Sequence, residues 1–192
     1  MPVKHREFFK KQVRAMSIEI EVLNGDASWA QVHPLFHAVW PPEVVATLPW
    51  AGITFANPDL RVLVLDEAGD VVSHVGLYRR VITWNGQKMN AAGIGGVLTR
   101  ADLRNRGLAT IALNAAIQTL RAEDAVNFAT LFCEPDRAPF YMARGFQPFE
   151  GQVYIEQPDQ GRVRFEATAP YVHDLKRSAP TRGTLDLCGL PW

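Results

Sequence analysis

The sequence predicts one mixed α/β domain, and three features indicate it. The chain has 192 residues, which is enough for a single compact domain with its own core. Runs rich in β-branched residues, separated by short turns, come first and are typical of an antiparallel meander. A strand–helix–strand unit follows in the middle of the chain, so helices are expected to flank the sheet.

Hydrophobic periodicity and turn residues place the elements along the chain. Apolar and acidic side chains alternate in the first strand, and proline or glycine marks where helices end. Asn85-Gly86 is the strongest hairpin signal, because both central residues of a type I′ turn need positive φ. Strands are expected at 17–23, 60–66, 71–84, 88–99, 126–133, 146–156, 162–169 and within 182–192. Helices are expected at 28–40, capped by Ser28, and at 43–48, 107–123 and 135–144, with a loop over 50–59.

Composition and charge exclude several classes of protein. Lys plus Arg and Asp plus Glu both number 20, so the balanced charge gives no electrostatic case for a nucleic-acid partner. No run of about 18 apolar residues is present, so no membrane partner is expected. Cys133 and Cys188 have no metal-ligand spacing and make no disulfide framework, which favours a reducing, cytoplasmic compartment and no metal.

The chain start is basic and lacks an apolar stretch. Residues 1–16 are therefore expected to be a flexible tail rather than a secretory signal, and the domain is expected to cover residues 17–192.

The most informative segment joins a glycine-interrupted strand to the next helix. Residues 97–109 read Val-Leu-Thr-Arg-Ala-Asp-Leu-Arg-Asn-Arg-Gly-Leu-Ala. The first N–H groups of a helix lack internal partners and lie at the positive end of its dipole, which suits a pyrophosphate. Gly107 would let phosphates approach the backbone, and Arg104 and Arg106 would add positive charge. A plain capping glycine before an amphipathic helix is the alternative explanation.

Two motifs resemble the GNAT superfamily of N-acyltransferases. The pattern Arg-x-x-Gly-x-Ala at 104–109 resembles the family's coenzyme A loop, and residues 140–146, Phe-Tyr-Met-Ala-Arg-Gly-Phe, resemble its second motif. The resemblance implies a central, mostly antiparallel sheet with a splayed parallel strand pair and flanking helices. It also implies acetyl-CoA or coenzyme A as co-substrate, bound by Val97, Leu98, Thr99, Arg104, Asn105, Arg106, Gly107, Leu108, Ala109 and Thr110.

The resemblance further implies transfer of an acetyl group to a primary amine by direct attack, through a tetrahedral intermediate. Tyr141 matches the family's general acid and is expected to have that role, with a packing tyrosine at a helix end as the alternative. His74 is a candidate proton relay on a strand, where a satisfied structural histidine is favoured. Further candidates for the base are Glu43, Asp26 and the carboxylate of Trp192.

A weaker resemblance leads to the aminoglycoside 2′-N-acetyltransferases, through residues 71–75, 95–97 and 141–146 and the terminal Trp192. Those enzymes have a glutamate where this chain has Gly95, so an aminocyclitol acceptor does not follow. A small-molecule amine is the expected acceptor. Acetylation of a protein or peptide amine, a non-catalytic acyl-CoA sensor and a homodimer stay open.

Aromatic residues gather before the third expected strand. The resemblance places this region over the acceptor, yet ordinary core packing is the favoured interpretation of the group Trp29, Phe36, Trp40, Trp50 and Phe55.

Overall fold

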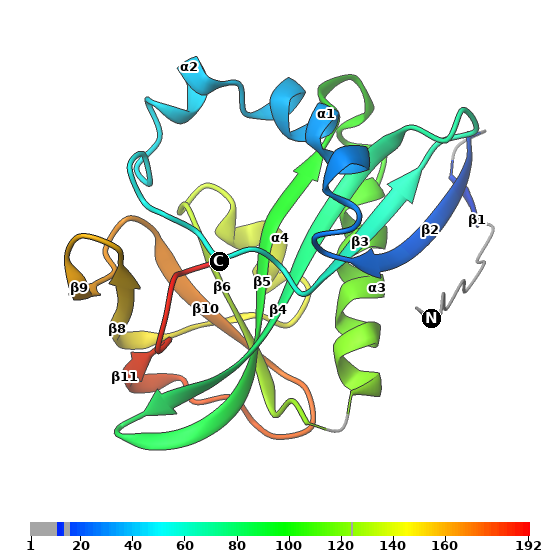
Figure 1. Ribbon diagram of the computed structural model, residues 1–192. Helices are drawn as coiled ribbons and strands as arrows, with labels where there is room; N and C mark the ends of the chain where they lie inside the picture. Colours follow the sequence, from blue (N-terminus) through cyan, green and yellow to red (C-terminus); the bar gives the residue numbers. More distant parts are fainter. Residues whose placement is uncertain (1–10, 14–15, 124) are drawn as a thin grey trace.

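The computed structural model describes residues 11–13, 16–123 and 125–192 (Figure 1). The flexible tail predicted over residues 1–16 falls mostly outside the described residues and stays a prediction. Of that range, the structure describes β1 (Lys11–Val13), which pairs with the next strand, and Met16.

One sheet of eleven strands forms the centre of the fold within the described residues. Its strands are β1, β2 (Met16–Asn24), β3 (Leu60–Leu65), β4 (Val71–Trp84), β5 (Gln87–Thr99), β6 (Phe128–Cys133), β7 (Gln147–Pro148), β8 (Glu150–Gln157), β9 (Gly161–Arg164), β10 (Ala169–Asp174) and β11 (Arg182–Asp186). The helices are α1 (Trp29–Val39), α2 (Pro42–Val45), α3 (Leu108–Ala122) and α4 (Ala138–Met142), with a 3₁₀ turn, η1 (Ala101–Leu103).

Neighbouring strands run antiparallel from β1 to β5, whereas β5 and β6 are parallel. The strand order continues from β6 to β10 and then β7. Strand β11 pairs with β8 on one side and with the hairpin end of β4 on the other. The sheet is therefore strongly curled, as Figure 1 shows. The predicted hairpin between β4 and β5 is confirmed, with φ of +47° at Asn85 and +80° at Gly86.

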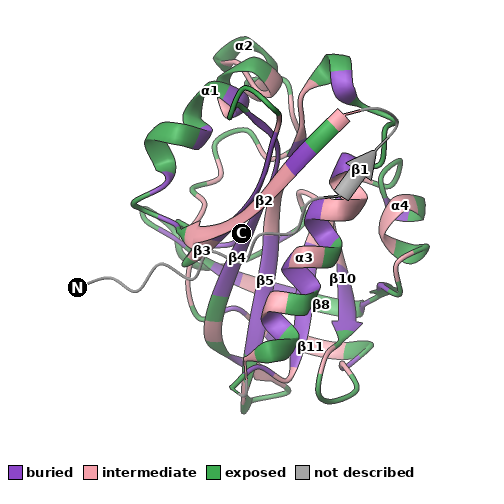
Figure 2. Ribbon diagram, turned by 90° about the vertical axis from the view of Figure 1, so that its right-hand side faces the viewer, coloured by how far each residue is buried: buried purple, intermediate pink, exposed green. Residues whose placement is uncertain are grey.

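The helices α1 and α3 cover opposite faces of the sheet, as the alternation along β3 shows. Val62 and Val64 belong to the apolar cluster that includes α3, whereas Leu63 and Leu65 belong to the cluster that includes α1. Figure 2 shows α3 lying across strands that are mostly buried. Each helix therefore buries one apolar face on the sheet and leaves its other face to solvent.

The parallel strands β5 and β6 stay together at one end only. Among the described residues, their pairing runs from Ala91↔Phe128 to Ile94↔Leu131 and goes no further, although β5 continues to Thr99. The expected mostly antiparallel sheet with a splayed parallel pair is thus confirmed.

A bulge in β5 lies within the splayed part. Between the pairs that contain Gly95 and Leu98, one residue of β4 faces two residues of β5, Gly96 and Val97. Gly96 has a φ of +57°, a left-handed conformation that favours glycine. The bulge turns the end of β5 away from its former direction and leaves its backbone accessible on the β6 side.

Three expectations about local structure are wrong. Ser28 occupies the expected N-cap position of α1, but its Oγ–H donates backwards to the Asn24 carbonyl at 2.7 Å, so its side chain makes no capping hydrogen bond. The strand expected at 146–156 is split into β7 and β8. The strand expected at 162–169 is wrong as well, because β9 ends at Arg164 and a separate strand, β10, begins at Ala169. Local sequence disfavours β10, since Pro170 lacks an N–H that could pair with a neighbouring strand.

Trp192 lies over the paired part of β5. Its indole N–H donates to the Thr130 carbonyl at 3.0 Å, and its ring stacks on that of Tyr78 with centroids 5.9 Å apart. A Cβ on Gly93 would lie 2.2 Å from the Trp192 ring, and one on Gly95 would lie 2.8 Å from the Trp192 carbonyl carbon. These two strand glycines are therefore required by the close approach of Trp192.

Gly93→Ala should lower the free energy of unfolding by about 1–3 kcal/mol, because overpacking a filled site costs about that much. Trp192→Ala should cost about 3–5 kcal/mol through loss of buried ring packing, but it removes the obstacle to a methyl group at Gly93. The double variant should therefore be less destabilised than the sum of the two single variants. Urea unfolding followed by circular dichroism measures all three, and strict additivity would contradict the contact.

Candidate active site

A cavity of about 900 Å³ opens where β5 and β6 part. Its walls are the bulged end of β5, the loop that leads into α3, the segment from β6 into α4, and parts of the chain between α1 and residue 58. The cavity therefore brings the predicted phosphate loop and the predicted acceptor region to one place.

The loop between η1 and α3 forms one end of the cavity. Asn105 and Gly107 have left-handed φ values of +62° and +85°, and no atom lies within 4 Å of a Cβ built on Gly107. The Ile111 N–H donates to the Gly107 carbonyl at 3.0 Å, so the N–H groups before Ile111 have no partner within the helix. This arrangement of open backbone and helix N-terminus suits a phosphate group.

All but one of the residues predicted to bind coenzyme A line the cavity. The exception is Arg106, which is exposed and lies outside the lining. The lining residues are Val97, Leu98, Thr99, Arg104, Asn105, Gly107, Leu108, Ala109 and Thr110.

His74 holds the bulge from the opposite strand. Its ring is fully buried, Nδ1–H donates to the Gly96 carbonyl at 2.6 Å, and Nε2 accepts from the Arg61 Nη1–H at 3.0 Å. Arginine can only donate, so these partners define the tautomer. Burial lowers the pKa of His74 to about 3, so the ring is neutral near pH 7. With both nitrogens engaged, the geometry favours a positioning role over the predicted proton relay.

Arg61 connects this bulge to the turn before α1. Its side chain is buried, and its Nε–H donates to the Gly25 carbonyl at 3.0 Å. Its guanidinium carbon lies 5.1 Å from the centroid of the Trp29 ring and 5.9 Å from that of Phe36. Sequence reasoning missed Arg61, because a lone arginine in a strand looks like an outward-facing residue until the register pairs its strand with that of His74.

The short helix α4 contributes Tyr141 to the cavity wall, and the turn that follows it contributes Arg144. The Tyr141 ring packs edge-on against Phe140 and Phe146, with centroids 5.0 and 5.8 Å away. Burial raises the pKa of Tyr141 above its ordinary value, so its hydroxyl keeps its proton at neutral pH. Arg144, another residue whose role was not predicted, donates to the Phe140 carbonyl and to Thr110 Oγ1, which ties α4 to the first turn of α3.

Cys133 and the remaining candidate bases differ in their surroundings and in their distance from the cavity. Burial raises the pKa of the Cys133 thiol to about 11, which makes it a poor nucleophile at neutral pH. Glu43 and Asp26 are exposed and lie outside the lining of the main cavity, whereas Trp192 is part of it.

Core packing describes only part of the aromatic group before β3: Phe36 and Trp40 pack against the buried cluster beneath α1, and the other three are not part of that cluster. None of these side chains reaches core burial, and all line the cavity: Trp29, Phe36, Trp40, Trp50 and Phe55. Their spacing could not separate the two roles, because apolar side chains suit a core and a ligand pocket equally.

Within residues 11–13, 16–123 and 125–192, no group of three or more His, Cys, Asp or Glu side chains could hold a metal ion. Over the same part of the chain, no helix has the length and apolar character needed to cross a membrane.

Comparisons with known proteins bear on both the family and the fold. The family model "Acetyltransferase (GNAT) domain" matches residues 25–149. An aminoglycoside 2′-N-acetyltransferase of Mycolicibacterium fortuitum is 27% identical over 90 residues, which span 47% of this chain and 45% of that protein. The match therefore covers about half the length of the curated relative.

Solved structures resemble the whole fold at low sequence identity. The GNAT family N-acetyltransferase YhbS from Escherichia coli, in complex with CoA, has a TM-score of 0.60 at 14% identity and covers 95% of this chain and 94% of its own. NAA60 from Arabidopsis thaliana, in complex with acetyl-CoA, has a TM-score of 0.55 at 10% identity, with 82% and 99% covered.

The buried His74 should make stability depend on pH. Its pKa is about 3 in the folded protein against an ordinary 6.5, so between these values the unfolded chain binds the extra proton. The contribution of His74 to the free energy of unfolding is fully present above pH 6.5. It falls as the pH drops toward 3, by up to about 1.4 kcal/mol per pH unit. Urea unfolding between pH 7 and pH 5 measures the slope.

His74→Gln is the matched control, because glutamine offers a donor and an acceptor but does not titrate. Burial also lowers the pKa of His173, and that contribution is common to both proteins. The variant should therefore show a shallower slope, and equal slopes would contradict a neutral, buried His74.

Proposed function

The chain belongs to the GNAT acetyltransferases, and on that premise we propose that it transfers the acetyl group of acetyl-CoA to a primary amine of a small molecule. The observation that carries the proposal is the cavity at the split between β5 and β6. One end of that cavity is a helix N-terminus suited to phosphates, and the other end is lined by aromatic rings.

The residues present fit coenzyme A. Gly107 leaves open space beside the backbone, the first N–H groups of α3 are free within the helix, and Arg104 adds a positive charge to the cavity wall. We assign the pyrophosphate to this loop and the pantetheine arm to the backbone of Val97 and Thr99, on the part of β5 that has no strand partner on the β6 side. Acetyl-CoA supplies an activated thioester.

Transfer requires a neutral amine and a donor for the oxyanion. The amine nitrogen attacks the carbonyl carbon, the C–N bond forms, the C–S bond breaks, the amine loses a proton and the thiolate gains one. We assign the oxyanion to the Val97 N–H, which lies in the bulge. The bond from His74 to the Gly96 carbonyl supports this assignment, because it orients the peptide that carries the Val97 N–H.

Tyr141 is the residue to which we assign the proton for the departing thiolate. It lines the cavity, and its raised pKa means that it holds its proton at neutral pH. A hydroxyl in that state can donate a proton or a hydrogen bond to a developing thiolate.

The segment after α2 favours a small acceptor over a protein. Trp50 packs against Trp40 with ring centroids 5.2 Å apart and against Phe55 at 5.6 Å, so the loop over residues 50–59 is held against the end of α1. This loop forms a wall of the cavity. A protein substrate would need an open groove at the same place.

We do not assign an aminoglycoside, the acceptor named for the curated relative, to this chain. A side chain at Gly95 would meet the Trp192 carbonyl carbon at 2.8 Å, so the position that carries a glutamate in aminoglycoside 2′-N-acetyltransferases has no room for one here. The base must therefore differ from that glutamate.

Gly107→Glu should weaken coenzyme A binding at least about tenfold, because it places negative charge and bulk beside the phosphates. Gly107→Ala is the matched control. Both variants carry the strain of a left-handed φ, of about 1–2 kcal/mol, but only glutamate adds charge. Calorimetric titration with coenzyme A measures both affinities, and equal affinities would contradict the assignment of the phosphates to this loop.

Acetyl-CoA at 100 times its Kd should also raise the free energy of unfolding of the wild-type protein by about 2.7 kcal/mol, because it binds only the folded state. A melting scan with and without acetyl-CoA measures the shift.

Tyr141→Phe should lower kcat by up to about 10²–10⁴, because the proton donor is lost while the ring still packs. Coenzyme A affinity should stay within about twofold. Tyr154→Phe, on β8 and away from the cavity lining, controls for loss of a tyrosine hydroxyl. Turnover at the wild-type rate, where chemistry limits, would exclude the acid role.

A further inference from the structure

The acceptor half of the cavity, lined by residues from 29–58 together with Arg61 and Tyr78, is walled by a series of aromatic rings. Successive rings meet edge to face, which keeps the rings in fixed relative orientations. The centroid distances are 5.4 Å for Trp29–Phe36, 5.8 Å for Phe36–Trp40, 5.2 Å for Trp40–Trp50 and 5.6 Å for Trp50–Phe55.

These rings keep surface available to a ligand. Trp29 is 43% exposed, and the other four side chains are half-buried rather than enclosed in the core. Aromatic faces and edges that border a cavity offer large contact area to a flat apolar body at low entropic cost.

Acidic side chains are missing from this half among the described residues. The acidic side chains that line the cavity, Glu134 and Asp136, come from the segment after β6, on the wall that also carries Tyr141, and the candidate carboxylate of Trp192 belongs to the backbone.

The charged side chain of the acceptor half is Arg61, which forms no ion pair within the part of the chain that the structure describes. Asp26 lies outside the cavity lining, in a smaller pocket that also contains Arg61, and its charge attracts the guanidinium. The contacts of Arg61 are the Gly25 carbonyl, His74 and the rings of the wall.

This charge distribution selects among amines. A polycation would lose water around several ammonium groups and would find no carboxylate side chain in the acceptor half to replace it. The guanidinium of Arg61 would repel each of those groups as well. A molecule with one amine would place only the reacting nitrogen near the bulge and could lay an apolar body against the rings.

We propose that the acceptor half binds a primary monoamine with an aromatic or otherwise apolar body, and that it rejects polycationic amines such as polyamines and aminoglycosides. The inference rests on the proposed function, because it identifies the acceptor of that reaction. The same surroundings reduce the need for a general base. Apolar walls and a nearby positive charge lower the pKa of a bound amine and so favour its neutral form, which is the form that attacks.

Binding to the protein saturated with coenzyme A is the direct test. Calorimetry compares 2-phenylethylamine, spermidine and kanamycin at one pH and ionic strength, and free-thiol release compares their kcat/KM with acetyl-CoA. We expect 2-phenylethylamine to bind and to react at least about tenfold better than either polycation.

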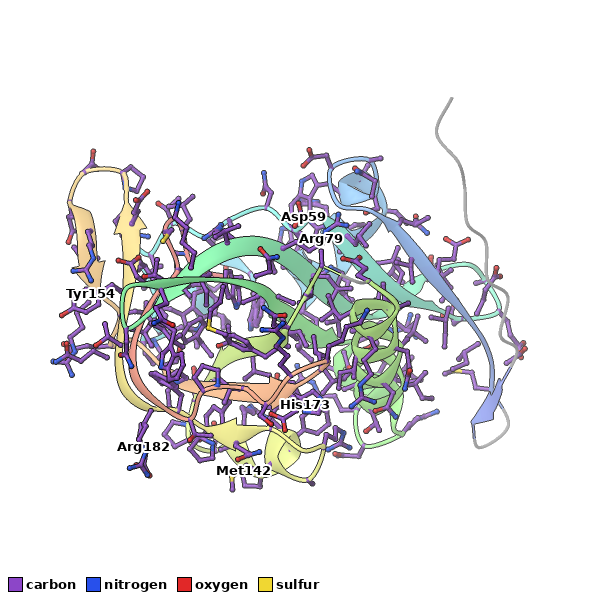
Figure 3. All side chains as sticks on the ribbon, turned by 90° about the horizontal axis from the view of Figure 1, so that it is seen from below. Asp59, Arg79, Met142, Tyr154, His173 and Arg182 are labelled. Carbon is purple, nitrogen blue, oxygen red and sulfur yellow. The ribbon has the colours of Figure 1, made fainter. Side chains whose placement is uncertain are left out.

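A charge-introducing variant tests the reason for the preference. Phe55→Glu should weaken binding of 2-phenylethylamine and improve binding of spermidine. The ratio of their affinities should therefore change by about tenfold or more in favour of spermidine. Phe55→Leu is the matched control, because it removes the ring without adding charge and should leave spermidine unbound. Tyr154 lies on the β8–β9 hairpin away from α1 (Figure 3), so Tyr154→Ala should leave the affinities for all three amines unchanged. Coenzyme A affinity should stay constant in every variant.

The outcomes separate the acceptor class from the transfer reaction. If 2-phenylethylamine binds preferentially but no amine is acetylated, the proposed transfer fails and the acceptor class stands. If spermidine or kanamycin binds more tightly, or if no amine binds the protein saturated with coenzyme A, the acceptor class is overturned. An unchanged amine preference in Phe55→Glu would remove the electrostatic explanation and overturn it as well.

Discussion

A buried hydrogen bond joins His74 of β4 to the carbonyl of Gly96, at the point where β5 leaves the sheet. It holds the left-handed Gly96 within the bulge, and in this part of β5 the strand is no longer paired with β6. The cavity occupies the space that this separation opens. Because Arg61 donates to the other nitrogen of His74 and to the Gly25 carbonyl, the same network ties the bulge to the turn from which α1 begins.

The two halves of the cavity have different structural origins. At the end to which we assign the pyrophosphate, one local segment forms the wall, in which a left-handed Gly107 is followed directly by α3. The acceptor half is built by side chains of α1 and the loop after α2, which contact one another through their rings. Substitutions in that loop can therefore alter which amine binds while the phosphate loop and the bulge stay in place.

Local signals predicted most of the fold. The bounds of β4, the hairpin at Asn85-Gly86 and the start of α3 after Gly107 all depend on neighbouring residues, so periodicity and turn chemistry were sufficient for them. The strand β10 was missed because its support is distant: it pairs with β6 in spite of Pro170, through a register that the local sequence does not contain.

The candidate site likewise contains residues that local sequence could identify and residues that it could not. The segment 104–109 could be singled out from the sequence because its residues are contiguous, and its role in binding phosphate stays a prediction. The roles of Arg61 and Arg144 depend on contacts with His74 and Thr110, which lie 13 and 34 residues away in the chain. The close approach of Trp192 to Gly93 and Gly95 likewise depends on how a distant segment returns to β5.

The distribution of tryptophan has a spectroscopic consequence. The chain has five tryptophans, and Trp29, Trp40, Trp50 and Trp192 line the cavity, whereas Trp84 donates to the Arg182 carbonyl at the far end of β4. Intrinsic fluorescence therefore reports mainly on the walls of one pocket, whereas far-ultraviolet circular dichroism reports on the sheet as a whole. A loosening of the pocket that leaves the strands paired would alter emission first, so the two signals together distinguish local opening from global unfolding.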